Sequence, residues 1–343
     1  MKTQNIILVI TIFYLGSLFS QNPNDAKTLV NEGIIYHDKG DFEGAIKCYD
    51  KALELDKDNL LALGEKAFSL NSLGKNNECI QICKLAIEKH KGEKELKNVY
   101  VSYADALDAQ KKTEAALQIY DIGIKSFPFY YQLYFNKGVT LAKLKKSEEA
   151  LMCFQRSAVY NPRNAASHDA IARTLYVKNN SIAALLAFCR FFTLENESAR
   201  GKKNLEYVRK ILKADIQKAL NDSMNNNTSK ENNFSSVSLI LSTEIVLDSD
   251  KKNIKKTEVE NFIRKFDKIY SALKETKNNN SGFYWDYYVP YFIELKDKGF
   301  IEIFANLVFY VSEDKSAQKW IKAHEEEVKR FLEWSKAYGW FNK

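Results

Sequence analysis

The most constraining feature of this chain is a pattern that returns five times at almost the same interval. A small residue, glycine or alanine, marks each unit at Gly33, Ala67, Ala104, Gly138 and Ala172. The intervals between these positions are 34, 37, 34 and 34 residues. A period of about 34 residues is typical of stacked helix–turn–helix units. One pair of helices cannot bury its apolar face alone, so the pattern predicts an all-α solenoid of about five helix pairs.

The spacing inside the first unit supports this interpretation. Gly33 and Tyr36 lie on one helical face, and Ala45 and Tyr49 lie on one face of a second helix. Gly40 falls between the two segments, where a turn is needed. Small residues let the two helices approach closely, and the large residue fills the space beside them. The physical pattern alone therefore indicates helix pairs.

With these residues in place, the chain resembles a tetratricopeptide-repeat protein over residues 26–198. Pro128 and Pro162 stand where the family ends a repeat with a helix-breaking proline. The other three units lack that proline, and Phe191 replaces a small residue in the fifth. The resemblance implies that the first helix of each pair lines a concave surface, and that the chain binds another protein or peptide along this groove.

The resemblance also implies which side chains point into the groove. The family's inward positions hold Val30, Ile34 and His37; Leu61, Phe68 and Asn71; Val101, Asp105 and Asp108; Gln132, Phe135 and Val139; and Asp169, Arg173 and Tyr176. This mixture of apolar side chains and scattered acids suits an apolar or amphipathic segment, or the chain's own C-terminal helices. Ordinary solvent exposure is the alternative.

The first repeat bears on one known class of partner. Family members that bind the acidic C-terminus of heat-shock chaperones need Lys and Asn at inward positions of that repeat. Val30 and Ile34 stand there instead. The resemblance therefore implies that this carboxylate clamp is absent.

The N-terminal residues 1–20 have the composition of a secretory signal peptide. Lys2 gives a basic start, residues 6–19 form an apolar run, and Ser20 offers a small residue at the junction. The run is too short to cross about 30 Å of hydrocarbon as a helix. We expect an exported protein of the periplasm with no membrane span after removal of the signal. A buried first helix and an uncleaved anchor are the alternatives.

The second half of the chain is expected to be helical as well. Residues 199–222 predict a helix that caps the open end of the repeats. Residues 223–233 are rich in asparagine and predict a linker. Residues 234–343 predict a smaller helical C-terminal domain, for which the sequence suggests no function of its own.

One stretch of the predicted C-terminal domain, which we call the tail, is unusually aromatic. Residues 283–292 contain seven aromatic side chains in ten positions. The first interpretation is that these rings form the core of the tail. The second is that Tyr284, Trp285, Tyr287 and Tyr288 form an exposed patch that binds glycan or peptidoglycan. A third is that this patch docks against the repeats. Exposure of these rings would favour the second interpretation, and burial would exclude it.

The usual catalytic and metal-binding motifs are missing, so we expect neither an enzyme nor a cofactor. Cys79 and Cys83, four residues apart, are interpreted as packed side chains, with a redox or metal pair as the alternative. His168 occupies a core position. The formal net charge of +7 has no clustered basic stretch behind it, which argues against a nucleic-acid partner. The sequence favours a non-enzymatic protein-interaction scaffold.

Overall fold

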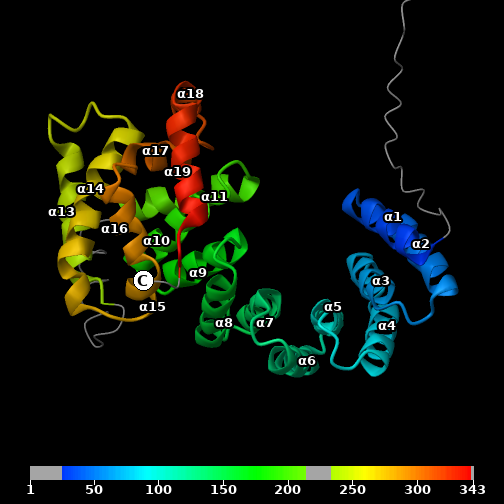
Figure 1. Ribbon diagram of the computed structural model, residues 1–343. Helices are drawn as coiled ribbons and strands as arrows, with labels where there is room; N and C mark the ends of the chain where they lie inside the picture. The colour runs from blue at the N-terminus through cyan, green and yellow to red at the C-terminus, as the bar shows by residue number, and fades with distance from the viewer. Residues whose placement is uncertain (1–24, 214–232, 341–343) are drawn as a thin grey trace, which may run out of the picture. The chain divides into compact units, whose positions relative to one another are not determined.

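The computed structural model describes residues 25–213 and 233–340. Every regular element in these ranges is a helix (Figure 1). None of these helices is both long and apolar enough to cross a bilayer. The contacts divide the chain into two compact units, one ending at Lys112 and the other beginning at Thr113.

The described part of the first unit contains five helices. They are α1 (Ala26–Asp38), α2 (Phe42–Leu55), α3 (Leu60–Ser72), α4 (Asn76–Lys89) and α5 (Leu96–Ala109). Each helix packs against the next one from α1 to α5, and α3 also contacts α1 and α5. This pattern of neighbours is that of stacked helix pairs, with α1, α3 and α5 as the first helices.

Local sequence sets where these helices begin. The side chains of Asp25, Asp41 and Asn59 each accept a hydrogen bond from a backbone amide three residues later, at the starts of α1, α2 and α3. Gly40 and Gly74 lie in the turns that follow α1 and α3, with φ of 81° and 72°. Side chains other than glycine rarely adopt such φ values, so the turns favour this residue.

The second unit begins with the second helix of the third repeat, followed by two helix pairs and a capping helix. These are α6 (Thr113–Ser126), α7 (Tyr131–Lys143), α8 (Ser147–Tyr160), α9 (Ala165–Val177), α10 (Ser181–Phe192) and α11 (Ala199–Leu212). The small residue of the fourth repeat explains the close approach of α7 and α8. A methyl group on Gly138 would lie 2.6 Å from the Phe154 ring, which is closer than side chains tolerate.

The described tail of the second unit adds seven α-helices. They are α13 (Ser235–Val246), α14 (Glu258–Thr276), α15 (Phe283–Tyr287), α16 (Val289–Asp297), α17 (Ile301–Val308), α18 (Ser316–Ala323) and α19 (Glu325–Ala337). Two 3-10 turns, Leu247–Ser249 and Lys277–Asn279, follow α13 and α14. Helices α13, α14 and α16 lie side by side (Figure 1).

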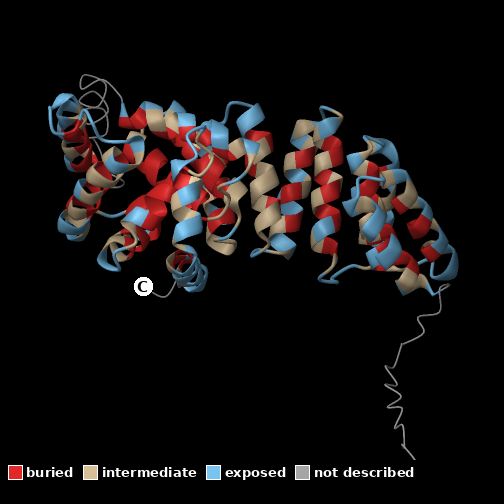
Figure 2. Cartoon of the chain, turned by 90° about the horizontal axis from the view of Figure 1, so that it is seen from above, coloured by how far each residue is buried: buried red, intermediate tan, exposed pale blue. Residues whose placement is uncertain are grey.

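Helix α10 joins the repeats to the tail. Every residue from Ile182 to Phe192 is buried, so the helix has no solvent-facing side. A helix without an exposed face is stable in water only when other elements cover it. Here α9, α11, α13 and α17 contact it. One hydrophobic cluster runs from Leu141 of the fourth repeat to Phe331 in α19, and it forms a continuous buried interior (Figure 2).

The predicted fold class is confirmed: helix pairs are followed by a helical C-terminal region. The predicted signal peptide (1–20) lies outside the described residues, and so does nearly all of the predicted linker (223–233). Helix α11 occupies the described part of the predicted capping segment, 199–222. The separation of a C-terminal domain from the repeats stays a prediction, and the tail shares its core with α7–α10.

Candidate functional site

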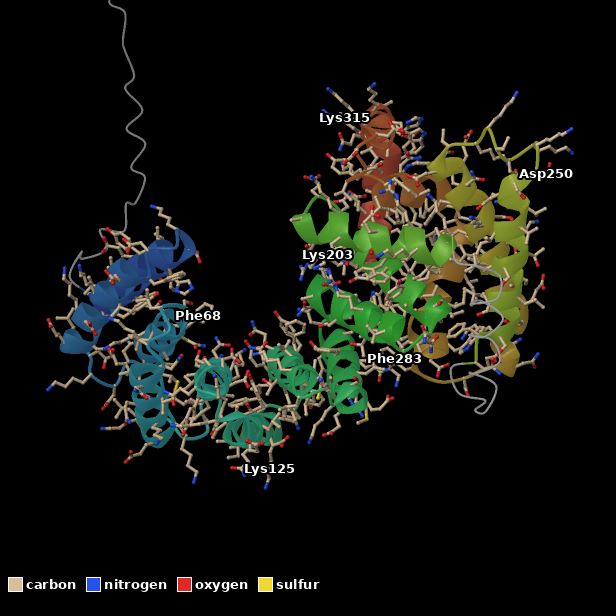
Figure 3. The ribbon with its side chains drawn as sticks, turned by 180° about the vertical axis from the view of Figure 1, so that it is seen from behind. Phe68, Lys125, Lys203, Asp250, Phe283 and Lys315 are labelled. Carbon is tan, nitrogen blue, oxygen red and sulfur yellow. The ribbon has the colours of Figure 1, made fainter. Side chains whose placement is uncertain are left out.

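The first helices of the first unit expose an apolar stripe, which consists of Leu61 and Phe68 on α3 and the ring of His37 on α1. The Phe68 side chain on α3 is 50% exposed and projects from its helix (Figure 3). The His37 ring of α1 stacks against it, with ring centroids 4.5 Å apart. The Nδ1 atom of His37 lies 2.7 Å from Oγ of Ser69, and burial lowers the pKa of the imidazole. Leu61, two turns before Phe68, is 46% exposed.

The sequence of α3 accounts for this stripe. Leu63, Ala67 and Leu70 share the face that packs against neighbouring helices, and all three are buried. Leu61 and Phe68 lie seven residues apart, which places them on one other face of the same helix. The helix is thus apolar on two faces, of which only one is covered by the described residues of the chain.

A pocket opens beside this stripe. It has a volume of about 290 Å³ and lies between α3 and the start of α5. Its lining residues are Leu60, Leu61, Gly64, Glu65, Lys94, Glu95, Lys97 and Asn98. The pKa of Glu65 is raised, mainly because burial disfavours the charged carboxylate and secondly because Asp38 repels it. The pocket therefore combines an apolar wall with a desolvated carboxylate.

The remaining predicted positions of the first unit are less exposed. Ile34, Asn71, Val101, Asp105 and Asp108 are all half-buried. They lie on the first helices α1, α3 and α5, as expected. Their part in binding stays a prediction.

Val30 does not fit the expectation. Its side chain is only 1% exposed and packs in the small hydrophobic cluster that includes Tyr49 and Ala62. Ala62 belongs to α3 of the next repeat, so α3 covers this position of α1. Val30 is a core residue, and a partner has no surface to contact there.

In the second unit the side chains at the predicted groove positions contact other residues of the same chain. Phe135 and Val139 are half-buried and pack against the large hydrophobic cluster. Arg173 donates to Asp169 at 2.6 Å and to Asn204 of α11 at 2.8 Å. The Tyr176 ring lies 4.9 Å from that of Tyr207, also on α11. The fifth repeat thus uses Arg173 and Tyr176 to hold the capping helix.

The aromatic patch is not a surface. Tyr284, Trp285, Tyr287 and Tyr288 are all buried, and the most exposed of them, Tyr287, reaches only 6%. The alternative of an exposed glycan-binding patch was therefore wrong, and the core interpretation holds. The reason is that α15 and α16 bury these rings against the fourth and fifth repeats. The adjacent Phe283 stacks on Tyr287, with ring centroids 5.0 Å apart.

The tyrosine hydroxyls of this segment form hydrogen bonds with the repeats. The Tyr287 hydroxyl donates to the carbonyl of Ala158 at 2.7 Å. The Gln155 amide donates to the hydroxyl of Tyr284 at 2.9 Å. The Tyr288 hydroxyl lies 2.8 Å from Nδ1 of His168. Buried tyrosines usually satisfy their hydroxyls in this way, and here the partners belong to α8 and α9.

Sequence reasoning missed a buried cation at the same junction. Arg190 is 1% exposed, and its guanidinium donates to Ser335 of α19 and to the carbonyl of Pro162, each at 3.1 Å. The Trp340 ring lies over it, 4.5 Å from the guanidinium carbon to the ring centroid. A single arginine inside the apolar run 182–192 was the available signal. Burial, followed by repulsion from Arg190, lowers the pKa of His168 to about 3.

The cysteines and acids form no metal site in the described residues: no group of three or more His, Cys, Asp or Glu side chains is placed to hold an ion. The sulfur atoms of Cys79 and Cys83 lie 3.9 Å apart and both side chains are fully buried. The contact with Cys79, together with burial, raises the pKa of Cys83, which keeps it a thiol. Both cysteines pack as small apolar side chains.

A second, larger cavity lies in the second unit. It has a volume of about 700 Å³, between α11 and the segment that joins α17 to α18. Lys203 and Lys315 border it (Figure 3), but so do Glu197 and Glu313. Its Arg209 already contacts Glu206 at 2.7 Å and Glu258 at 2.6 Å. The mixed charge favours no one class of ligand.

Comparison with known proteins identifies two of the repeats. Tetratricopeptide-repeat family models match residues 26–59 and 131–164. The chain carries tetratricopeptide repeats. These two matches fall on the first and fourth units of the sequence pattern.

The curated relatives are similar over part of their length. A Triticum aestivum protein named Hsp70-Hsp90 organizing protein is 34% identical over 131 residues, which are 37% of this chain and 22% of that protein. A Dictyostelium discoideum STIP1 homolog is 32% identical over 104 residues, 29% of this chain and 18% of that protein. The chain thus spans about a fifth of the length of these relatives.

Among solved structures, a thermophilic tetratricopeptide-repeat protein of Thermus thermophilus is similar, with a TM-score of 0.48 and 15% identity. The similarity covers 54% of this chain and 99% of that one.

Proposed function

We propose that this protein is a non-enzymatic scaffold that binds an amphipathic segment of a protein partner along α1, α3 and α5. One observation carries the proposal: Phe68 stands half-exposed on a first helix, stacked on His37, with Leu61 exposed on the same face. An apolar stripe of this kind, bordered by polar side chains, marks an interaction surface more often than an isolated exposed residue does.

The expected binding energy is consistent with this role. Complete burial of a large apolar side chain contributes about 1.5–3 kcal/mol. Phe68 and Leu61 are already half-buried, so a partner that covers both gains roughly that amount from the pair. The groove is preformed by packed helices, so few side chains need to be ordered on binding. The remaining affinity comes from the partner's contacts with the half-buried polar rim.

The proposed partner segment is apolar or amphipathic rather than a terminal carboxylate. The Triticum aestivum relative is named for Hsp70 and Hsp90. In this chain the first repeat offers Ile34 and a buried Val30 at the positions where chaperone-binding family members need Lys and Asn. The proposal therefore does not extend to chaperone tails.

A matched pair of variants tests the proposed function. Phe68→Glu places a charge in the stripe, and Phe129→Glu places the same charge on a side chain that is 75% exposed in the second unit. Wild type and both variants would be used for affinity capture from the source cells, after circular dichroism shows that all three fold.

We expect a set of partners that wild type and Phe129→Glu retain and that Phe68→Glu loses. Partners retained equally by all three proteins would contradict the proposal and move the binding surface away from α3.

We further propose that the mature protein is exported to the periplasm. The support is the apolar run at residues 6–19 behind the basic Lys2. N-terminal sequencing of protein purified from the envelope fraction of the source cells tests this. A start near Gln21 agrees with export, and an intact Met1 in the cytosolic fraction contradicts it.

A further inference from the structure

We infer that the pocket at Gly64 is an anchor site for a tryptophan or tyrosine side chain of the partner. The inference rests on the proposed function, because it names the side chain that the groove selects. It follows from three observations: a glycine that packing does not require, an apolar wall, and a carboxylate that forms no ion pair with any described residue.

Gly64 differs from the glycines at the contacts within the helix pairs. A methyl group on Gly33 would overlap the Tyr49 ring, and one on Gly138 would lie 2.6 Å from the Phe154 ring. At Gly64 the nearest atom to such a methyl group is Cγ2 of Val99 at 3.7 Å, an ordinary contact. Packing therefore explains the first two glycines and does not explain Gly64.

The backbone does not require glycine at this position either. Gly64 lies inside α3, where its φ is negative as in any helical residue. In the interior of a helix, glycine is about 0.8–1 kcal/mol less favourable than alanine. The residue thus weakens its helix without serving the fold. Because Gly64 has no side chain, the pocket that it lines stays open, with a total volume of about 290 Å³.

The walls of the pocket favour a large side chain with an apolar body. Leu60 and Leu61 form one side, and Phe68 lies one helical turn beyond Gly64. Helical residues four apart are neighbours on the surface, so a ring seated over Gly64 lies next to the Phe68 ring. Aromatic pairs gain about 0.5–1.5 kcal/mol beyond the area that they bury.

Glu65 favours a hydrogen-bond donor at the tip of that side chain. Within the part of the chain that the structure describes it makes no ion pair, and burial raises the pKa of its carboxyl. One rim cation, Lys94, pairs with Glu95 at 3.7 Å. An indole N–H or a phenol O–H would satisfy Glu65 from within an apolar ring. A lysine or arginine anchor would instead approach the two rim cations, Lys94 and Lys97.

A peptide selection on the full chain tests the inference. A random peptide library would be selected on wild type alone, and the selected peptides would then be measured on Gly64→Leu, which fills the pocket. Gly64→Ala provides a second variant that leaves most of the pocket open and replaces glycine with a better helix former. Lys84→Ala, at an exposed position of the second helix α4, is the control.

We expect peptides that bind wild type and Lys84→Ala equally and bind Gly64→Leu about tenfold or more weakly. These peptides should be enriched in tryptophan or tyrosine, and Gly64→Ala should weaken them by an intermediate factor. Peptides that bind Gly64→Leu as well as wild type would overturn the inference. So would pocket-dependent peptides enriched in leucine or in basic residues without an aromatic.

The Phe68→Glu variant separates this inference from the proposed function. Selected peptides that bind Gly64→Leu but not Phe68→Glu would support binding along the groove and contradict anchoring in the pocket. Selected peptides that bind both variants as well as wild type would contradict both binding along the groove and anchoring in the pocket.

Discussion

Two aromatic regions of this protein have opposite surroundings. The segment from Phe283 to Phe292 is crowded with rings, and Trp285 and Tyr288 within it are fully buried. Phe68 stands almost alone on α3, and half of its side chain faces solvent. The dense run of aromatics was interpreted first as core, with an exposed binding patch as an alternative, and it is the core. The comparison teaches that crowding of rings indicates core packing, whereas a lone ring on a first helix indicates an available surface.

The largest expected effect tests the core side of this comparison. Trp285→Ala should lower the free energy of unfolding of the second unit by about 3–5 kcal/mol, because it removes a fully buried ring. That ring stacks on Phe234 with centroids 4.5 Å apart. All four tryptophans lie at or beyond residue 285, so denaturation followed by tryptophan fluorescence reports on this unit. A loss below about 1 kcal/mol would contradict the packing described here.

The next effect concerns the two kinds of glycine in the first unit. Gly33→Ala should destabilise it by about 1–3 kcal/mol, because the new methyl group overlaps the Tyr49 ring. Gly64→Ala should stabilise it by up to about 1 kcal/mol, because the site has room for the methyl group. Circular dichroism during denaturation measures both. Equal effects of the two changes would remove the contrast on which the Gly64 pocket depends.

The stability of the second unit should depend on pH through His168, which contacts Tyr288 where the tail packs against the fifth repeat. Burial holds the pKa of His168 near 3, against an ordinary value of 6.5. Above pH 6.5 the imidazole is neutral in both states and has no effect. As the pH falls from 6.5 toward 3, the unfolded chain takes up a proton that the folded chain refuses. Stability is therefore lost, by about 1.4 kcal/mol for each pH unit once the unfolded state is protonated.

The measurement is the free energy of unfolding of the second unit at several pH values, for wild type and for His168→Gln. We expect a shallower decline for the variant between about pH 6.5 and 4, whatever its stability at neutral pH. The same substitution at His90, which lies in the first unit, is the control for the measurement on the second. Parallel slopes for wild type and His168→Gln would place the histidine outside the core.

The smallest expected effect tests the surface side of the comparison. Phe68→Ala should change the free energy of unfolding of the first unit by about 0.5 kcal/mol or less, since half of the side chain is already in solvent. Binding of the partner should fall at the same time. A destabilisation as large as that of Trp285→Ala would mean that Phe68 serves the fold instead of recognition.

Much of the fold could be predicted from local spacing. The interval between Gly33 and Ala67 and the turn at Gly40 predicted helix pairs that the structure contains. The candidate site was predicted less completely. Phe68 and His37 lie together on the first helices as expected, but no pattern in the sequence indicated that Gly64 leaves a pocket between α3 and α5. That pocket depends on where Val99 and Lys94 of the following repeat lie.

The pattern of residues specifies which segments are helices and which side chains share a face, because both follow from neighbours a few residues away. Which of these faces is covered depends on contacts between distant segments. Helix α3 buries Val30, α11 engages Arg173 and Tyr176, and α8 and α9 bind the hydroxyls of Tyr287 and Tyr288. Each of these contacts joins segments far apart in the chain. The hydrophobic effect rewards burial against any apolar surface, so the sequence pattern does not specify which surface that will be.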